Sequence, residues 1–389
     1  MYHKLRYSLK AFIHDSRSVG LLLLACTVIS LLLCNLSAGS SYLAFWHQPI
    51  DSLEAFHLPH TPIEVINDLL MAVFFFLAGM EIKRELIKGE LASLKKASLP
   101  VVGAILGVLA PAVIFLLFNR GTGFEHGWGI PTATDIAFSI GVAALLGPKV
   151  PYSLKIFLTA LAIIDDLCAI LIIALFYGGQ IAWLWLLTAV VCMVLLQGVN
   201  KWSRGSLKHV MRISLGLLLW FATFKSGIHP TIAGILLAFM IPVDELPFYE
   251  KRVHFPVNFI IIPLFALANT CILLPENLSD VWTSTVSWGI FLGLFIGKPL
   301  GISLICFTGI KAGWFKLPEG ATRLQFIGIT ILAGIGFTMS IFVTSLAYDT
   351  TQLQTDAKLS ILVASILAMI VGYIWLNAAA AKNKRSLQR

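Results

Sequence analysis

Residues 153–176 read SLKIFLTALAIIDDLCAILIIALF, an apolar run whose charged residues are one lysine, Lys155, and two adjacent aspartates, Asp165 and Asp166. An α-helix needs about 20 mainly apolar residues to cross a bilayer. The run therefore predicts a transmembrane helix that carries two carboxyl groups in its middle.

The rest of the chain has the same apolar character. Hydrophobic types make up 58% of the 389 residues and charged types only 12%, whereas a soluble domain usually carries about 25% charged residues. Twelve apolar segments follow one another, at 19–38, 62–80, 99–118, 127–146, 153–176, 181–199, 210–226, 228–243, 256–274, 286–306, 324–348 and 359–380. This pattern excludes a water-soluble protein and predicts one all-α membrane domain over residues 1–389.

Lys and Arg residues orient these segments, because cytoplasmic loops attract positive charge. Of the 28 Lys and Arg residues, almost all fall in alternate loops and at the two termini. The exceptions are Arg120, Lys225, Lys298 and Lys358. We therefore expect both termini in the cytoplasm, with residues 1–18 leading into the first helix and residues 381–389 forming a disordered tail.

The net charge of +8 does not indicate a nucleic-acid partner. Basic residues lie at the segment ends rather than in a patch with interleaved aromatic residues. The six cysteines are scattered through apolar runs without the spacing of metal ligands. We interpret them as buried thiols, and no cofactor is indicated.

Several ionisable side chains lie inside apolar segments, where each costs about 2.5–3.5 kcal/mol. They are Asp68 in the second segment, Asp135 in the fourth, Asp165 and Asp166 in the fifth, and Lys298 in the tenth. A lone carboxylate in a membrane can be a structural hydrogen-bond acceptor between helices. Three carboxylates in two successive helices, together with a lysine, instead favour a functional site.

The adjacent aspartates have the chemistry of an exchange site. Neighbours on a helix point about 100° apart, so Asp165 and Asp166 can reach one cavity. Two close carboxylates resist joint ionisation and take up a proton readily, while a small hard cation such as Na⁺ prefers the same oxygen ligands. Lys298 is the natural counter-charge: it forms a salt bridge with one carboxylate or releases a proton during the cycle, and the sequence leaves both roles open.

The fourth and eleventh segments predict interrupted helices. Residues 127–137 contain Pro131, two threonines and Asp135, which are poor formers of a continuous helix. Residues 334–340 read GIGFTMS within an otherwise apolar run. Interrupted helices in corresponding positions of two halves indicate a transporter ion site. We expect Asp135 to neutralise the positive helix N-termini and Lys298 the negative C-terminal ends.

A cluster of charges lies at the cytoplasmic ends of the second and ninth segments. Its members are Glu81, Arg84, Glu85, Glu250 and His254. The cluster is either an interfacial charge anchor or a pH-responsive group in which His254 titrates near neutral pH.

The loop at residues 39–61 is rich in aromatic residues. It contains Tyr42, Phe45, Trp46 and Phe56 with three His and no Lys or Arg. This composition indicates an ordered cap or contact element.

Together these motifs resemble the NhaA-type sodium/proton antiporters over essentially the whole chain. The resemblance lies in residues 67–76, 81–86, 134–138, 162–166, 297–301 and 334–340. It implies a twelve-helix bundle in a bacterial inner membrane, with helices three to five and ten to twelve as inverted repeats and the fourth and eleventh crossing as broken helices. It also implies a short periplasmic β-hairpin within residues 39–61 that joins two protomers into a homodimer.

The same resemblance implies roles for individual residues. Asp166 would be the main cation ligand and proton carrier, Asp165 a second carrier or the partner of Lys298, Thr134 an assisting ligand, and Asp135 a balancing charge at the helix ends. Glu81, Arg84, Glu85, Glu250 and His254 would fall in the pH-sensing region. There the chain has Glu250-Lys251 where the best-known pattern has a Glu-His pair.

The function that follows is exchange of Na⁺ or Li⁺ for H⁺ by alternating access, electrogenic and regulated by pH, in a transporter that is not an enzyme. Two other classes compete with it. A cation channel would need filter loops or rings of charge, which the sequence lacks. An intramembrane aspartyl protease would carry Asp after a Gly-x-Gly motif, but Gly334-Ile335-Gly336 is followed by Phe337.

Overall fold

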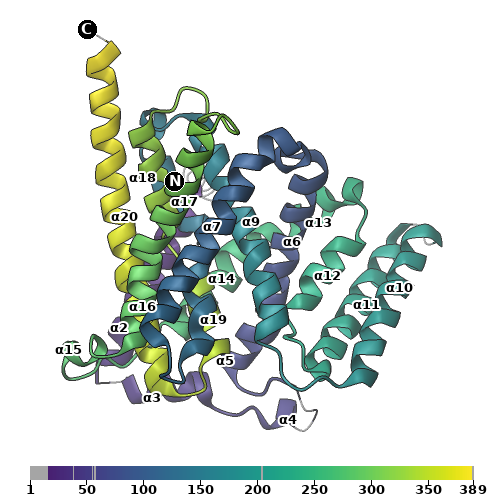
Figure 1. Cartoon of the computed structure of the whole chain (residues 1–389). Helices are drawn as coiled ribbons and strands as arrows, with labels where there is room; N and C mark the ends of the chain where they lie inside the picture. The colour runs from purple at the N-terminus through teal and green to yellow at the C-terminus, as the bar shows by residue number, and fades with distance from the viewer. Residues whose placement is uncertain (1–15, 38, 55, 57, 203–204, 388–389) are drawn as a thin grey trace, which may run out of the picture. The chain divides into compact units, whose positions relative to one another are not determined.

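A computed structural model describes residues 16–37, 39–54, 56, 58–202 and 205–387 (Figure 1). These residues form α-helices and short 3₁₀ or π segments, labelled η, and the described part of the chain contains no β-strand. Eleven helical stretches in it are long and apolar enough to cross a membrane. The prediction of a multi-pass all-α membrane protein is confirmed.

The chain divides into two compact units, and α2 and α9 each contribute to both. The first unit holds residues up to 24, 90–169 and 272–389. Its helices are the start of α2 (Ser16–Asn35), η2 (Glu90–Ala92), α7 (Leu94–Asn119), η3 (Glu125–Thr132), α8 (Ile136–Leu145), η4 (Gly147–Lys149), most of α9 (Tyr152–Phe176), α15 (Leu278–Val281), α16 (Thr285–Leu292), η7 (Gly293–Gly297), α17 (Lys298–Lys311), α18 (Arg323–Ala333), α19 (Phe337–Ala347) and α20 (Thr351–Leu387).

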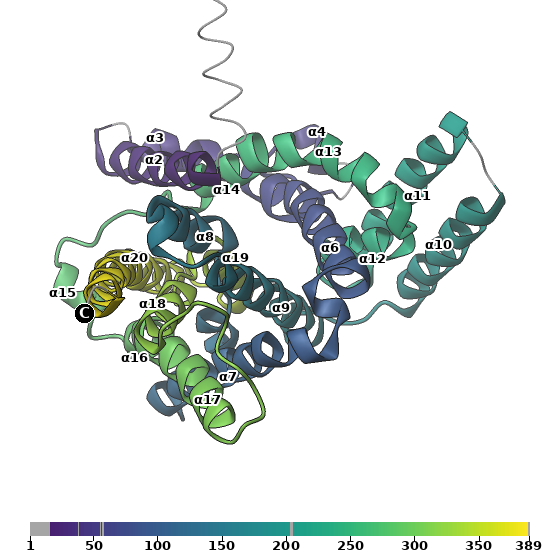
Figure 2. The same cartoon turned by 90° about the horizontal axis from the view of Figure 1, so that it is seen from above.

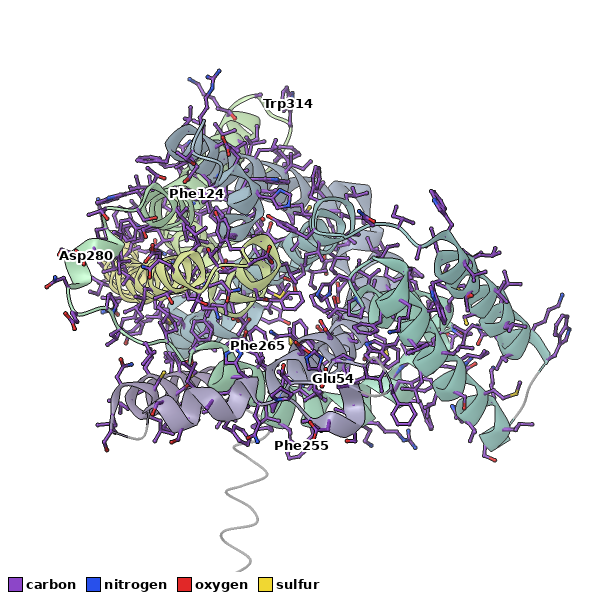
Figure 3. All side chains as sticks on the ribbon, turned by 90° about the horizontal axis from the view of Figure 1, so that it is seen from below. Glu54, Phe124, Phe255, Phe265, Asp280 and Trp314 are labelled. Carbon is purple, nitrogen blue, oxygen red and sulfur yellow. The ribbon has the colours of Figure 1, made fainter. Side chains whose placement is uncertain are left out.

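In the first unit, α7 packs on α16 and α17, and α20 packs on α16, α18 and α19 (Figure 2). Small residues allow these close approaches, as is usual between helices in a membrane. A side chain at Gly301 of α17 would collide with the Leu106 carbonyl of α7. Side chains fill the spaces between the helices, whereas Trp314, after α17, projects outward and is 73% exposed (Figure 3).

The second unit holds residues 25–89 and 170–271. Its helices are the rest of α2 and α9, α3 (Gly39–His47), α4 (Asp51–Glu54), α5 (Pro62–Glu64), η1 (Val65–Leu70), α6 (Met71–Lys88), α10 (Trp183–Trp202), α11 (Gly205–Ser226), α12 (Ile232–Met240), η5 (Val243–Glu245), α13 (Leu246–Pro256), η6 (Val257–Ile261) and α14 (Ile262–Asn269). Gly234 of α12 lies against the Ala72 backbone of α6, where a larger residue would not fit.

The eighth predicted span, residues 228–243, is shorter than expected. Its one α-helix is α12, Ile232–Met240, which is too short to be among the eleven long helices of the described chain. Pro242 explains its end: the residue before a proline is pushed out of the helical region, and Ile241 is extended, with ψ 132°. The count of twelve spanning helices is therefore not confirmed.

Two further segments, the loop at residues 39–61 and the C-terminal tail, contain helix in the structure. In place of the β-hairpin expected within residues 39–61, the described residues form α3 and α4. Residues 42–46 are consecutively apolar or aromatic and lack the two-residue alternation of a strand. At the C-terminus, α20 continues to Leu387, so the described part of the expected tail 381–389 is drawn as helix. Residues 388–389 and most of the N-terminal segment 1–18 lie outside the described residues.

Candidate functional site

The two interrupted spans touch at their interruptions within the first unit. The fourth breaks at residues 133–135, between η3 and α8, and the eleventh at residues 334–336, between α18 and α19. The Asp135 backbone N–H donates to the Ile335 carbonyl over 2.7 Å. This contact satisfies two backbone groups that the breaks leave without helical partners, as a span in a membrane requires.

Asp135 lies at the N-terminal ends of two half-helices. Its Oδ1 accepts from the Phe138 backbone N–H of α8 at 3.1 Å, and its Oδ2 accepts from the Thr338 backbone N–H of α19 at 3.0 Å. The Thr338 hydroxyl donates to the same Oδ2 over 2.5 Å. One buried carboxylate thus faces the positive ends of both helix dipoles.

Lys298 lies at the opposite kind of helix end. It is fully buried at the start of α17, and its Nζ donates to the carbonyl of Thr132, the last residue of η3, over 2.5 Å. The same Nζ is 2.7 Å from Asp165 Oδ2. The ammonium therefore meets both the negative end of a half-helix and one of the paired aspartates, which is the salt bridge that the sequence left as one of two options.

Asp165 has two differently occupied oxygens. Oδ2 forms the salt bridge with Lys298 Nζ and lies 2.7 Å from the Thr134 hydroxyl. The same hydroxyl lies 2.8 Å from the Ala333 carbonyl. Oδ1 is buried and has no hydrogen-bond partner among the residues that the structure describes. Gly107 of α7 faces this oxygen: a Cβ added there would lie 4.0 Å from it and 2.9 Å from the Ile302 side chain.

Asp166, the next residue of α9, is 5% exposed, whereas Asp165 is completely buried. A carboxylate at this depth is costly unless charge or hydrogen bonds compensate it. Asp165 Oδ2, the Thr134 hydroxyl and the Ala333 carbonyl are linked at the two breaks, and Asp166 is the next residue of α9. This is an all-oxygen set of the kind that hard cations prefer.

The charged cluster predicted on α6 and α13 belongs to the second unit. Arg84 and Glu250 form an ion pair at 2.5 Å, and Glu81 is close enough to Arg84, Glu250 and Glu85 to interact electrostatically. His254 is on the same helix as Glu250 but exposed. The structure thus joins the two predicted halves of the cluster, with His254 at its edge.

Asp68 also lies in the second unit, in the π segment η1. Its Oδ1 is 3.5 Å from His229 Nε2, and its carbonyl accepts from the Trp220 indole N–H over 2.9 Å. Sequence reasoning assigned no role to His229, nor to Thr338 of the first unit. A histidine within the eighth apolar segment and a hydroxyl within the 334–340 motif were the available signals.

Comparison with known proteins identifies the family. Residues 10–376 match the model of the family described as Na⁺/H⁺ antiporter 1. The chain belongs to this family. Among its relatives, the Na(+)/H(+) antiporter NhaA of Cytophaga hutchinsonii is 44% identical, with 95% of this chain and 94% of the relative covered.

Two further members give the same result. The Na(+)/H(+) antiporter NhaA of a Sulfurovum species is 42% identical over 97% of this chain and 100% of its own length. NhaA 1 of Klebsiella pneumoniae is 44% identical over 95% and 96%. The family likeness therefore extends over both compact units and over every span that carries a site residue.

Proposed function

We propose that this chain is a transporter that exchanges Na⁺ or Li⁺ for H⁺, and that Asp165, Asp166 and Thr134 hold the cation. The observation that carries this assignment is the position of Asp165: a fully buried carboxylate at the contact between two interrupted helices, with one oxygen held by Lys298 and Thr134. Membership of the antiporter family supports the same function.

The charge at the site favours Asp166 as the main cation ligand. Asp165 and Lys298 form an ion pair at 2.7 Å and neutralise each other. The negative charge that remains for an incoming cation is that of Asp166. A proton neutralises Asp166 equally well, so H⁺ and Na⁺ compete for the same oxygens, and exchange follows when the site opens to one side at a time.

The Asp165–Lys298 ion pair offers a second exchangeable proton, that of the Lys298 ammonium. A cation that also draws on Asp165 competes with the Lys298 ammonium for that carboxylate. An ammonium that loses its partner in a dry interior releases a proton readily. More than one proton per cation then moves net charge, so transport is electrogenic and is driven by the membrane potential at about 2.3 kcal/mol per charge for each 100 mV.

The arrangement of the first unit supports an inverted repeat. Apart from the start of α2, this unit consists of spans three to five and ten to twelve of the predicted series. Each triplet has its interrupted span in the middle, and the two interruptions are hydrogen-bonded to each other. Paired interruptions of this kind frame the ion sites of transporters with inverted repeats.

Orientation, regulation and assembly complete the proposal. We place the chain in a bacterial inner membrane with both termini in the cytoplasm, which requires α12 and its flanking residues to act as a short twelfth crossing. The charged cluster of Glu81, Arg84, Glu85, Glu250 and His254, which includes the Arg84–Glu250 ion pair, would carry the regulation by pH. A homodimer in contact with lipid remains a prediction, with α3 and α4 rather than a hairpin as the contact element.

The test is a transport assay on everted membrane vesicles with a pH-sensitive dye. Asp166→Asn is expected to abolish the fluorescence recovery that Na⁺ or Li⁺ produces. Asp356→Asn is the matched control, because Asp356 is a buried carboxylate of the same unit whose Oδ1 accepts from Gln352 over 3.1 Å, away from the site contacts. Full recovery in Asp166→Asn at equal protein levels would refute the assignment.

The same vesicles separate an antiporter from a channel. A cation channel would carry radioactive ²²Na⁺ without moving the dye signal, whereas an antiporter changes both together. No contact among the described residues supports a channel or an intramembrane protease.

A further inference from the structure

Two cysteine sulfur atoms in the second unit lie unusually close together. Cys34 is in the last turn of α2, and Cys271 follows the end of α14. Their Sγ atoms are 3.1 Å apart. Packed carbon atoms stay about 3.5–4.0 Å apart, and sulfur is the larger atom, so these sulfurs are inside ordinary contact distance.

The two cysteines extend a line of contacts between α2 and α14, the α2–α14 seam, which also includes Ser30 and Leu267. One turn deeper, the Ser30 hydroxyl donates to the Leu267 carbonyl over 2.6 Å. Ser30 and Cys34 are four residues apart on α2 and share one helix face, while Leu267 is on α14 and Cys271 lies just beyond its end at Asn269. The numbering rises in the same direction on both sides, which means that the two helices run parallel.

Helix α3 also contacts the α2–α14 seam. The Tyr42 hydroxyl of α3 lies 3.1 Å from Ser30 Oγ and 3.2 Å from the Leu267 carbonyl. The end of α2 and α14 lie side by side (Figure 2). A cross-link between the two sulfurs would therefore join two segments that these contacts already hold together, and would shorten the 3.1 Å separation of the sulfurs to a bond of about 2.05 Å.

The location favours oxidation. Parallel helices end on the same side of the membrane, and both thiols lie at the C-terminal ends. In the orientation proposed above, that is the side of the 39–61 loop, the periplasm, where disulfides form and persist. Cys34 is 1% exposed and Cys271 is half-buried, so Cys271 is the sulfur that an external oxidant reaches.

We propose that Cys34 and Cys271 form a disulfide bond in the mature protein. The oxidant is the disulfide of a periplasmic thiol–disulfide exchange protein. The Cys271 thiolate attacks that disulfide to give a mixed disulfide, and the Cys34 thiolate then attacks the Cys271 sulfur. Two S–H bonds are lost and one S–S bond forms, while two electrons and two protons convert the oxidant to its dithiol.

The test uses the full-length chain in living cells. Cells are quenched with acid, and the denatured protein is alkylated before and after reduction and analysed by mass spectrometry of its peptides. We expect most copies to yield a linked peptide that contains both residues and vanishes on reduction. The remaining four of the six cysteines, Cys26, Cys168, Cys192 and Cys306, are expected to be alkylated without reduction and serve as internal controls.

Matched variants sharpen the result. In Cys34→Ser, Cys271 is expected to become alkylated without reduction, and in Cys271→Ser the same is expected of Cys34. In a strain without the periplasmic oxidant, the linked peptide is expected to fall to a minor fraction. Direct alkylation of both thiols in most copies of the native chain would overturn the proposal.

The inference rests on the proposed orientation but not on the transport mechanism. Labelling of a Ser52→Cys variant of exposed α4 with an impermeant maleimide, in intact spheroplasts, tests the orientation separately. Transport in vesicles tests the exchange activity. A linked peptide in a chain that fails to transport would support the disulfide and refute only the function.

Discussion

Lys298 and Asp165 form a completely buried ion pair, and the structure predicts how its members depend on each other. In Lys298→Met, Asp165 loses its counter-charge in a dry interior. Breaking a buried pair by removing one partner costs about 3–5 kcal/mol. The Thr132 carbonyl also loses the donor that reaches it over 2.5 Å.

The second variant combines Lys298→Met with Asp165→Asn and so also removes the charge of Asp165. In this double variant, neither charge of the pair is left, and the remaining defect of the pair is the carbonyl of Thr132. An unsatisfied buried acceptor costs about 1–3 kcal/mol. That cost is common to both variants, so the double variant is expected to be more stable than Lys298→Met alone by about 3–5 kcal/mol, the cost of the unpaired Asp165 charge.

The assay is a titration of detergent-solubilised protein with dodecyl sulfate, followed by circular dichroism, on the native chain, both single variants and the double variant. Transport in vesicles is measured in parallel and is expected to fail in every variant that alters Asp165. If the double variant is no more stable than Lys298→Met, the two side chains do not compensate each other, and the electrostatic account of the site is wrong.

Two further predictions concern the same unit and one the charged cluster. Thr338→Val removes the hydroxyl donor to Asp135 but keeps the backbone donor, so it is expected to lower the free energy of unfolding by about 1–2 kcal/mol, and an unchanged unfolding curve would contradict that bond. Thr134→Val is expected to raise the Na⁺ concentration for half-maximal exchange by about 5- to 30-fold, the equivalent of about 1–2 kcal/mol, whereas an unaltered Na⁺ dependence would remove Thr134 from the cation site. Glu250→Gln breaks the ion pair with Arg84 and is expected to shift the pH profile of exchange with little change in its maximal rate, so a profile identical to that of the native chain would show that the pair only anchors the helices.

Hydropathy and charge along the chain were enough to predict the spans. Eleven of the twelve apolar segments correspond to long helices of the described chain, because the bilayer requires about 20 apolar residues wherever a helix crosses. The interruptions in the fourth and eleventh spans were equally visible. Pro131 lies two residues before the first break, and Gly334 and Gly336 lie in the second, where a larger side chain would collide with Leu294.

Two short segments differ from the expectation, one drawn from the family resemblance and one from hydropathy. Residues 39–54 form helices α3 and α4 instead of part of a β-hairpin, and residues 228–243 contain only a short helix. A resemblance transfers the elements of relatives, but the conformation of a short segment depends on this chain's own side chains and on what they pack against. Trp46, for example, is buried on α3.

The sequence suggested that Lys298 pairs with a carboxylate, but the particular atoms that meet the buried charges came from the tertiary structure. Asp135 and Thr338 are 203 residues apart, and Lys298 meets the Thr132 carbonyl across 166 residues. The sequence indicated that such charges must be compensated, because water is absent at that depth. Which oxygen meets which donor depends on the rotation and close packing of whole helices, and these are properties of the folded chain, not of any one segment.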